Sequence, residues 1–320
     1  MQNIVVHEVG PRDGLQAEKL AVPLEEKIRW VEGLFLAGVD VIQLGSFVNP
    51  EKVPQMADTD ALFRHFVGNK PANVTLSGLV LNEKGLERGF ACGVEMFCMG
   101  VSASETHSLK NTGMTTAEAL GRIISMAKQA MDAGKKVQAS VQSAFGCGFD
   151  GPIKQEKVLH IVKSYVDAGI RNISLADTAG HAQPRQVEDL YGTICELYPD
   201  IELACHFHNT YGLGLANCYA ALKNGVTYFE SAFGGLGGCP FTKLPAGNVC
   251  TEDLVHSLQR MGLRQDIKLD VLLNVARQVS AFFNRELPGF ILKSGSIVNF
   301  SRPSLRDPSE ASGRSNPIQN

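Results

Sequence analysis

The sequence predicts an α/β fold, a (β/α)8 barrel with additional C-terminal helices. Short apolar runs alternate along the chain with segments of helical periodicity, at the spacing typical of strand–helix units. Eight such runs occur, and several end just before a glycine or a polar turn, as the parallel strands of a closed barrel do. The length of 320 residues and the hydrophobic content of 44% are enough to bury a sizeable core.

The elements follow one another in a regular order. Strands are expected at residues 3–8, 39–45, 73–80, 94–100, 137–143, 171–176, 202–208 and 226–232. Helices are expected at residues 24–37, 83–91, 116–133, 155–168, 184–197, 214–224 and 248–261. Glycine stands directly after four of these helical segments, where a left-handed residue commonly ends a helix: Gly38, Gly134, Gly169 and Gly225.

The end of the chain differs from the repeating units. Residues 267–284 have the pattern of one more amphipathic helix, so we expect a single barrel domain over residues 1–300 that includes a C-terminal helical extension. Residues 301–320 are rich in Ser, Pro, Arg, Asp and Asn and have few apolar side chains. Such a segment cannot bury enough surface to offset its ordering entropy, and we expect a mobile tail.

Composition narrows the class of protein. The net charge of −3 and the pI of about 6.3 argue against nucleic acid as a partner. Apolar stretches are interrupted well before the length of about 18 residues that a membrane span needs. The N-terminus enters an apolar run without a cationic leader, and the eight cysteines include no Cys-x-x-Cys pair. These features favour reduced thiols and a cytoplasmic protein.

A pair of histidines indicates a metal site. His206 and His208 lie at the end of a predicted strand, where alternate residues share a face and stand about 7 Å apart. Hydrogen-bonded barrel histidines would produce the same pattern. Asp13, which follows the first strand, favours the metal interpretation, and Asn248 offers an amide oxygen. Carboxylate, imidazole and amide ligands together suit Mg²⁺ or Mn²⁺, although Asn248 alternatively fits the N-cap of the helix at 249–261.

Other polar residues converge on the same rim. Active sites of such barrels lie at the carboxyl ends of the strands. The predicted strand ends carry Arg12 and Asp13 (first strand), Gln43 (second), Asp177 (sixth), His206 and His208 (seventh), and Cys239 and Asn248 follow the eighth.

Several segments carry a resemblance to a known family. They are residues 9–16 (VGPRDGLQ), residues 46–56 (SFVNPEKVPQM), Asp177-Thr178, and the run from His206 to Asp253. Within that run, the glycine-flanked cysteine segment 234–240 (GGLGGCP) is far more specific than the histidine pair. The chain resembles the 3-hydroxy-3-methylglutaryl-CoA lyases, which are metal-dependent TIM-barrel lyases. The superfamily also contains isopropylmalate, citramalate and homocitrate synthases, which lack the glycine-flanked cysteine loop.

The resemblance implies a reaction. It is a metal-dependent retro-Claisen cleavage of a 3-hydroxy-3-methylglutaryl-CoA-like acyl-CoA to acetyl-CoA and a keto acid, acetoacetate in the case of methylglutaryl-CoA, as in leucine degradation. It also implies an acyl-CoA partner, and we expect a homodimer or higher homo-oligomer. The alternatives are a lyase for a related acyl-CoA such as citramalyl-CoA, a Claisen-type synthase joining acetyl-CoA and a 2-oxo acid, and a non-catalytic acyl-CoA-binding barrel.

Roles for the residues follow from the same resemblance and their chemistry. Asp13, His206, His208 and Asn248 are expected to bind Mg²⁺ or Mn²⁺. Arg12 is expected to stabilise the enolate oxygen and Cys239 to protonate the enolate carbon. The general base is expected to be His206 or Asp177, and Gln16 and Gln43 are expected to contact the substrate.

The chain departs from the resembled lyases at several positions. Gln43 stands where they carry an acidic residue, Asn209 where they usually carry Asp, and Phe241 where they usually carry Tyr. These changes would suit a different acyl group as well as variation within a subgroup. Recognition of CoA leaves no clear signature, and loop residues Lys52, Lys110 and Lys154 are the candidates for phosphate contacts.

Overall fold

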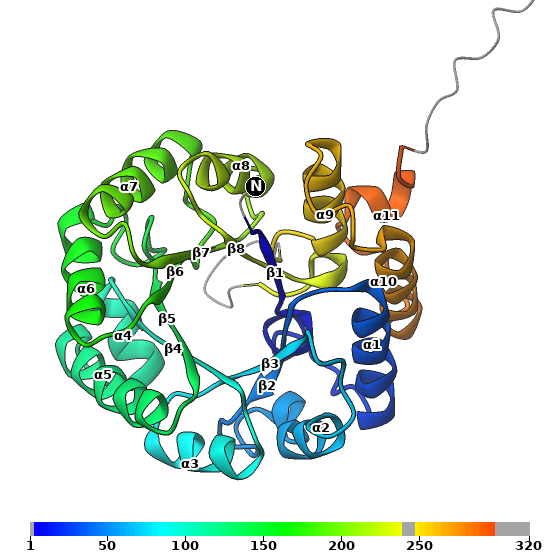
Figure 1. Cartoon of the computed structure of the whole chain (residues 1–320), viewed down its shortest axis with the longest axis horizontal. Coiled ribbons are helices and arrows are strands. Elements are labelled where there is room, and N and C mark those ends of the chain that lie inside the picture. Colours follow the sequence, from blue (N-terminus) through cyan, green and yellow to red (C-terminus); the bar gives the residue numbers. More distant parts are fainter. Residues whose placement is uncertain (1–2, 239–246, 298–320) are drawn as a thin grey trace, which may run out of the picture.

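The computed structural model describes residues 3–238 and 247–297 of the chain. In this part, eight parallel strands close into a barrel in sequence order, and helices form a ring around it (Figure 1). The strands are β1 (Val5–Glu8), β2 (Val41–Ser46), β3 (Thr75–Leu79), β4 (Met96–Ser102), β5 (Lys136–Gln142), β6 (Asn172–Asp177), β7 (Glu202–Phe207) and β8 (Tyr228–Ser231). Because β1 pairs with both β2 and β8, the predicted (β/α)8 barrel is confirmed.

The helices largely match the predicted segments. They are α1 (Leu24–Ala37), α2 (Thr59–Phe66), α3 (Glu83–Ala91), α4 (Glu105–Thr112), α5 (Thr116–Asp132), α6 (Gln155–Asp167), α7 (Pro184–Leu197), α8 (Gly214–Lys223), α9 (Thr251–Arg260), α10 (Leu269–Phe283) and α11 (Phe290–Ser294). Short π- or 3-10 turns are η1 (Gly10–Gly14), η2 (Pro54–Met56) and η3 (Phe233–Gly235). α2, α4 and the short α11 were not predicted.

The helix expected from residue 248 begins three residues later. Residues 248–250 are instead held by strand-like bridges, His208 to Asn248 and Ala232 to Cys250. The backbone of Asn248 and Cys250 is therefore engaged with the ends of β7 and β8 before α9 starts at Thr251. This displacement brings Asn248 to the mouth of the barrel.

The C-terminal extension packs on the first helix of the barrel. α10 lies against α1, as Figure 1 shows, so closely that a Cβ at Gly33 would come within 2.5 Å of Val275 Cγ2. The Trp30 ring makes edge contacts with Phe282 of α10 and with Phe233 of η3. The expected tail at residues 301–320 lies outside the described residues. Among the helices that the structure describes, none is long and apolar enough to cross a lipid bilayer.

Candidate metal centre and active site

The turn after β1 places Arg12 and Asp13 at the barrel mouth. Residues Gly10–Gly14 form a π-helical turn in which the amides of Arg12 and Asp13 donate to the carbonyl of Val9 at 3.1 and 2.7 Å. Proline in the first turn of a helix loses no hydrogen bond, so Pro11 fits at the second position of this turn. The Glu8 carboxylate secures the start of the turn by accepting the Gly10 amide at 2.7 Å.

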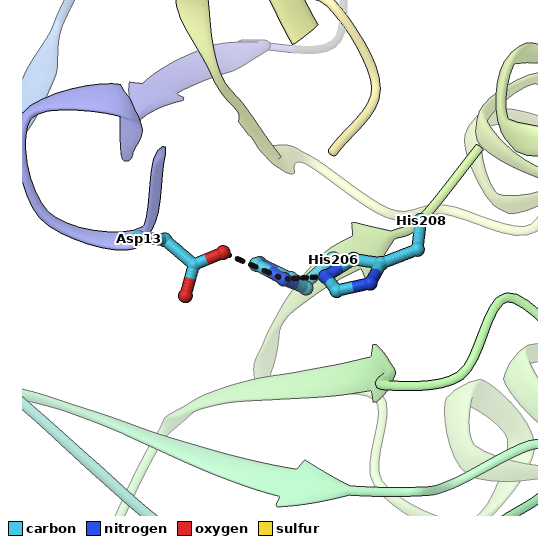
Figure 2. Close-up of side chains that lie close together, drawn as sticks. All are labelled: Asp13, His206 and His208. Atoms are coloured by element: carbon cyan, nitrogen blue, oxygen red, sulfur yellow. Dashed lines mark hydrogen bonds and ion pairs between the residues drawn. The ribbon is translucent and has the colours of Figure 1, made fainter. Parts of the chain in front are cut away.

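Three predicted ligands meet at one point. Figure 2 shows Asp13 directed toward the paired rings of His206 and His208. The Nε2 atoms of the two rings are 3.2 Å apart, and Asp13 Oδ2 lies 3.9 Å from His206 Nε2. One ligand atom from each of the three residues lies within 4.8 Å of the others. A carboxylate and two imidazoles at this spacing can bind one divalent cation.

Asn248 completes the set of oxygen and nitrogen donors. Its side-chain amide donates to Asp13 Oδ2 at 2.7 Å and to the carbonyl of Leu236 at 3.0 Å. Its Oδ1 atom is buried and has no hydrogen-bond partner. The alternative N-cap role is wrong, because Cys250 occupies the N-cap of α9 and no side chain caps it. A buried acceptor without a donor beside Asp13 fits a cation ligand.

Electrostatics prepare these groups to bind a cation. Burial alone would raise the pKa of Asp13, but the charge of the neighbouring Arg12, together with His206 and the Asn248 amide, holds that pKa well below its usual range. Burial and the neighbouring His206 lower the pKa of His208 to about 4, so this ring is neutral at physiological pH. A carboxylate and a neutral imidazole are the forms in which these side chains bind metals.

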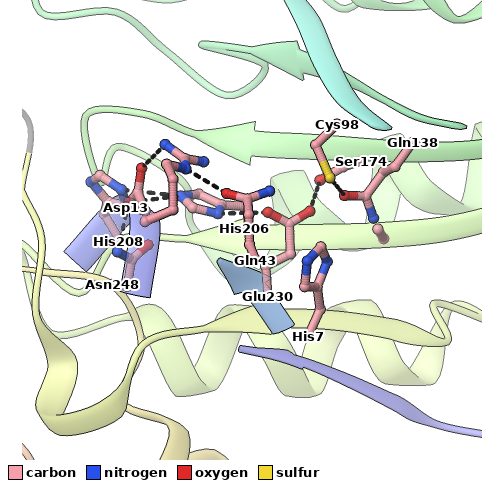
Figure 3. Close-up of polar contacts among 12 residues, drawn as sticks. His7, Asp13, Gln43, Cys98, Gln138, Ser174, His206, His208, Glu230 and Asn248 are labelled. Atoms are coloured by element: carbon pink, nitrogen blue, oxygen red, sulfur yellow. Dashed lines mark hydrogen bonds and ion pairs between the residues drawn. The ribbon is translucent and has the colours of Figure 1, made fainter. Parts of the chain in front are cut away.

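Arg12 links the metal centre to the second strand. Its guanidinium donates to Asp13 Oδ1 and, through Nε, to Gln43 Oε1. Figure 3 shows Asp13 and Gln43 among the polar residues at the barrel mouth. Gln43 lies inside β2 rather than at its end as predicted, and it is 1% exposed. The amide thus fixes the guanidinium without neutralising its charge, in contrast to an acidic residue at the same position.

Sequence reasoning missed the residue behind His206. Glu230 of β8 is paired in register with His206, and its Oε2 lies 2.9 Å from His206 Nδ1. Glu230 Oε1 accepts a hydrogen bond from Ser174 Oγ at 2.7 Å. The available signal was the one charged residue in the strand predicted at 226–232, since a buried charge there requires a partner.

Two further buried carboxyl groups, those of Glu8 and Glu252, hold the backbone at Phe233 and Gly234, which precede Cys239 in the sequence. Besides the Gly10 amide, Glu8 accepts the Phe233 amide at 3.0 Å, and Glu252 accepts the Gly234 amide at 3.0 and 3.1 Å. Burial raises the pKa of Glu8 to about 8 and that of Glu252 to about 7. Neither residue was predicted. Cys239 itself lies outside the described residues.

Asp177 and Gln16 are not among the converging ligands. In the register of β6 and β7, Asp177 is paired with Phe207, so it does not share the inward face with His206. Its Oδ1 accepts the His181 amide at 2.7 Å, its Oδ2 is buried without a partner, and burial raises its pKa to about 7. Gln16 follows η1 and has a buried Oε1 without a partner.

Comparisons with known proteins agree with this geometry. The HMGL-like family model matches residues 3–279. Hydroxymethylglutaryl-CoA lyase YngG of Bacillus subtilis is 35% identical over 287 residues, which cover 90% of this chain and 95% of that protein. (R)-Citramalyl-CoA lyase of Chloroflexus aurantiacus is 37% identical over 305 residues, which cover 93% and 96%.

A solved structure of an HMG-CoA lyase also matches this chain. The HMG-CoA lyase of Acinetobacter baumannii, determined in complex with coenzyme A and 3-methylmalate, has a TM-score of 0.87 and 37% identity. The match covers 92% of this chain and 96% of that one. The chain thus belongs to the HMGL-like family and is a carbon–carbon lyase of the hydroxymethylglutaryl-CoA lyase type.

Proposed function

We propose that this lyase cleaves 3-hydroxy-3-methylglutaryl-CoA, or an acyl-CoA closely like it, to acetyl-CoA and a keto acid, which is acetoacetate for methylglutaryl-CoA and would serve leucine degradation. The observation that carries the proposal is the meeting of Asp13, His206 and His208 beside the unpartnered Oδ1 of Asn248 and the guanidinium of Arg12. The family supplies the reaction type, and these residues supply the groups that it requires.

The reaction needs a bound divalent cation. We propose that Mg²⁺ or Mn²⁺ is held by Asp13, His206, His208 and Asn248. When bound, the cation would acidify and orient the tertiary hydroxyl of the substrate. The proposed general base for the hydroxyl is His206 or Asp177. Both ring nitrogens of His206 already face other groups, Nε2 toward His208 and Nδ1 toward Glu230. Asp177 lies outside the converging ligands, but its Oδ2 is unpartnered and its pKa of about 7 suits a general base.

Loss of that proton starts the cleavage. The oxygen–carbon electron pair forms the ketone, the adjacent carbon–carbon bond breaks, and its electrons pass to the acetyl-CoA enolate. Arg12 would stabilise the negative charge on the enolate oxygen, since its guanidinium is fixed by Asp13 and Gln43. The Cys239 thiol would then donate a proton to the enolate carbon, and the thiolate would regain a proton from solvent. Gln16 and Gln43 are proposed to contact the acyl group.

Citramalyl-CoA is the second candidate substrate. The relative from Chloroflexus aurantiacus is a citramalyl-CoA lyase, and a relative from Pseudomonas aeruginosa, 34% identical, is named as a lyase for 3-hydroxy-3-isohexenylglutaryl-CoA and hydroxymethylglutaryl-CoA. Of the two departures that the structure describes, Gln43 contacts Arg12, whereas Asn209 accepts the Gly214 amide at 3.0 Å and stands outside the ligand set. Phe241 lies outside the described residues.

A cleavage assay tests the proposal. The purified enzyme is offered methylglutaryl-CoA, citramalyl-CoA and a longer 3-alkyl homologue, with Mg²⁺, with Mn²⁺ and with excess chelator. We expect cleavage of methylglutaryl-CoA that chelation abolishes and either cation restores. His208→Ala should raise the Mn²⁺ concentration needed for half-maximal activity, and His160→Ala, an exposed change on α6, should not. Full activity in chelator refutes the metal role.

Gln43→Glu identifies the acyl group. If methylglutaryl-CoA is the physiological substrate, this change should preserve or raise its cleavage. If citramalyl-CoA is cleaved with the higher kcat/KM and Gln43→Glu damages that cleavage, the second candidate is correct. Lys110, which lies over the Phe149 ring at 4.2 Å, is the described lysine that we would replace first to test CoA binding. The homo-oligomer stays a prediction for sedimentation analysis.

A further inference from the structure

We propose that Glu230 is a positioning residue for the metal centre. It holds the proton of His206 on Nδ1 and thereby presents the bare Nε2 to the cation. The inference rests on the proposed metal-dependent function. It goes beyond that function because it assigns a role to a residue of β8 that is not itself one of the ligands.

Each carboxylate oxygen of Glu230 has a hydrogen-bond partner. Oε2 lies 2.9 Å from His206 Nδ1, and Oε1 accepts the Ser174 hydroxyl at 2.7 Å. The three residues lie on neighbouring strands β6, β7 and β8 and all face into the barrel, as Figure 3 shows. Glu230 is 7% exposed, so water competes little for its oxygens. Two hydrogen bonds from opposite sides leave the carboxylate no freedom to turn away from His206.

A fixed carboxylate determines which imidazole nitrogen can bind a cation. Neutral imidazole carries one proton, and the nitrogen without it is the one that can coordinate a metal. Since Nδ1 faces the carboxylate, the proton is favoured there, and Nε2 is left as the donor atom. Nε2 is also the atom that lies 3.2 Å from His208 Nε2 and 3.9 Å from Asp13 Oδ2. The contact with Glu230 and the spacing of the proposed ligand atoms therefore favour the same tautomer of His206.

The two histidines differ in their support. His208 Nδ1 is buried without a hydrogen-bond partner, whereas His206 Nδ1 has Glu230. A carboxylate behind an imidazole ligand orients the ring and increases its basicity, and loss of such a partner typically weakens metal binding by about 10–100-fold. His206 is thus the anchored ligand of the pair, and its tautomer depends on Glu230.

Two variants and a control separate this role from simple structural support. Glu230→Gln keeps the shape but removes the charge, and Glu230→Asp withdraws the carboxylate by one methylene group. Ser77→Ala serves as the control, because Ser77 is also buried in the barrel and its hydroxyl contacts the ring of His7 at 2.8 Å. Circular dichroism and thermal unfolding establish that each variant is folded.

The first measurement is Mn²⁺ binding, followed by the electron paramagnetic resonance signal of the free ion. We expect both Glu230 variants to bind Mn²⁺ about 10–100-fold more weakly than the wild type and Ser77→Ala to bind as the wild type does. If the wild type binds Mn²⁺ and the Glu230 variants bind equally well, the role of Glu230 is refuted and the metal site stands. If the wild type itself fails to bind Mn²⁺, the proposed metal function fails and this inference fails with it.

The second measurement is the histidine tautomer in the metal-free protein, read from ¹⁵N chemical shifts. Against the effect of burial, Glu230 raises the pKa of His206, so the spectra are recorded at about pH 9, well above the ordinary pKa of imidazole. The signal of His206 is assigned by its loss in His206→Asn. We expect Nδ1 to be protonated in the wild type and a mixture of tautomers in Glu230→Gln. An unchanged Nδ1-protonated ring in that variant overturns the proposal, whatever the metal titration gives.

Discussion

Gly237→Ala should disturb the metal centre through a residue that binds nothing itself. Gly237 has φ of +106°, and a Cβ built there would lie 2.5 Å from Asn248 Nδ2 and 3.5 Å from Asp13 Oδ2. Asn248 cannot simply move away, because its side-chain amide donates to both Asp13 and the Leu236 carbonyl. The substitution therefore breaks at least one of these hydrogen bonds and displaces the unpartnered Oδ1.

The loss of folding stability that Gly237→Ala should cause has two parts. The left-handed backbone costs a non-glycine residue about 1–2 kcal/mol. Loss of a buried hydrogen bond at Asn248 costs about 1–3 kcal/mol more. Gly134→Ala isolates the first part, because Gly134 has φ of +73° and a Cβ added there would meet no atom within 4 Å. For a chain of this length, the difference between the variants corresponds to a Tm about 2–4 °C lower for Gly237→Ala.

Thermal unfolding and Mn²⁺ titration of the two variants test this reasoning. Gly237→Ala should unfold at the lower temperature and bind Mn²⁺ at least about tenfold more weakly, since a protein ligand is displaced. Gly134→Ala should lose stability alone. Equal Tm values, together with wild-type Mn²⁺ affinity in Gly237→Ala, would show that the contact between Gly237 and Asn248 does not hold the site.

Three further outcomes are expected. Arg12→Met should lower kcat by at least about 10²-fold with a smaller change in KM, and a change confined to KM would mean that Arg12 binds substrate without stabilising the enolate. Cys239→Ser should abolish cleavage, while binding of the acyl-CoA, measured by calorimetry, should persist. Alkylating reagents should modify Cys239 first, because six of the seven described cysteines are buried. Modification of another cysteine first would argue against the role of Cys239. Burial raises the pKa of Glu8 from 4.5 to about 8, so the folded protein keeps a proton that the unfolded chain has released. Stability should therefore fall by about 1–2 kcal/mol as the pH rises from about 6.5 to about 8, and Glu8→Gln should remove that part of the dependence in thermal unfolding, whereas an identical slope in the variant would contradict the shift.

Much of the fold could be predicted because the strands are buried on both faces. Each observed strand overlaps an apolar run that is visible in the sequence. The three missed helices are short: α2 and α4 have eight residues each and α11 has five. α4 has one large apolar side chain, Leu109, which is exposed, and it is defined instead by the Ser104 cap and by Gly113 at its end. Short helices fixed by caps leave little periodicity to detect.

The site could be predicted only where a residue's position along one strand was sufficient. Asp13, His206 and His208 follow from strand ends and alternation. The link between His206 and Glu230 depends on the register between β7 and β8, which no local pattern specifies. The place of Asn248 depends on strand-like bridges that delay α9, and these too are tertiary contacts.

The backbone around Asn248 also joins the two described stretches of chain that flank residues 239–246. The backbone amide of Asn248 donates to the Leu236 carbonyl at 3.2 Å, that of Asn209 donates to the Gly247 carbonyl at 3.0 Å, and a Cβ at Gly247 would overlap Gly235. The chain on either side of residues 239–246 is thus joined into a closed base. Because this base is held by contacts among described residues, replacements at residues 240–246, which leave the proposed acid Cys239 in place, are expected to keep Asp13 and Asn248 in position to bind the cation.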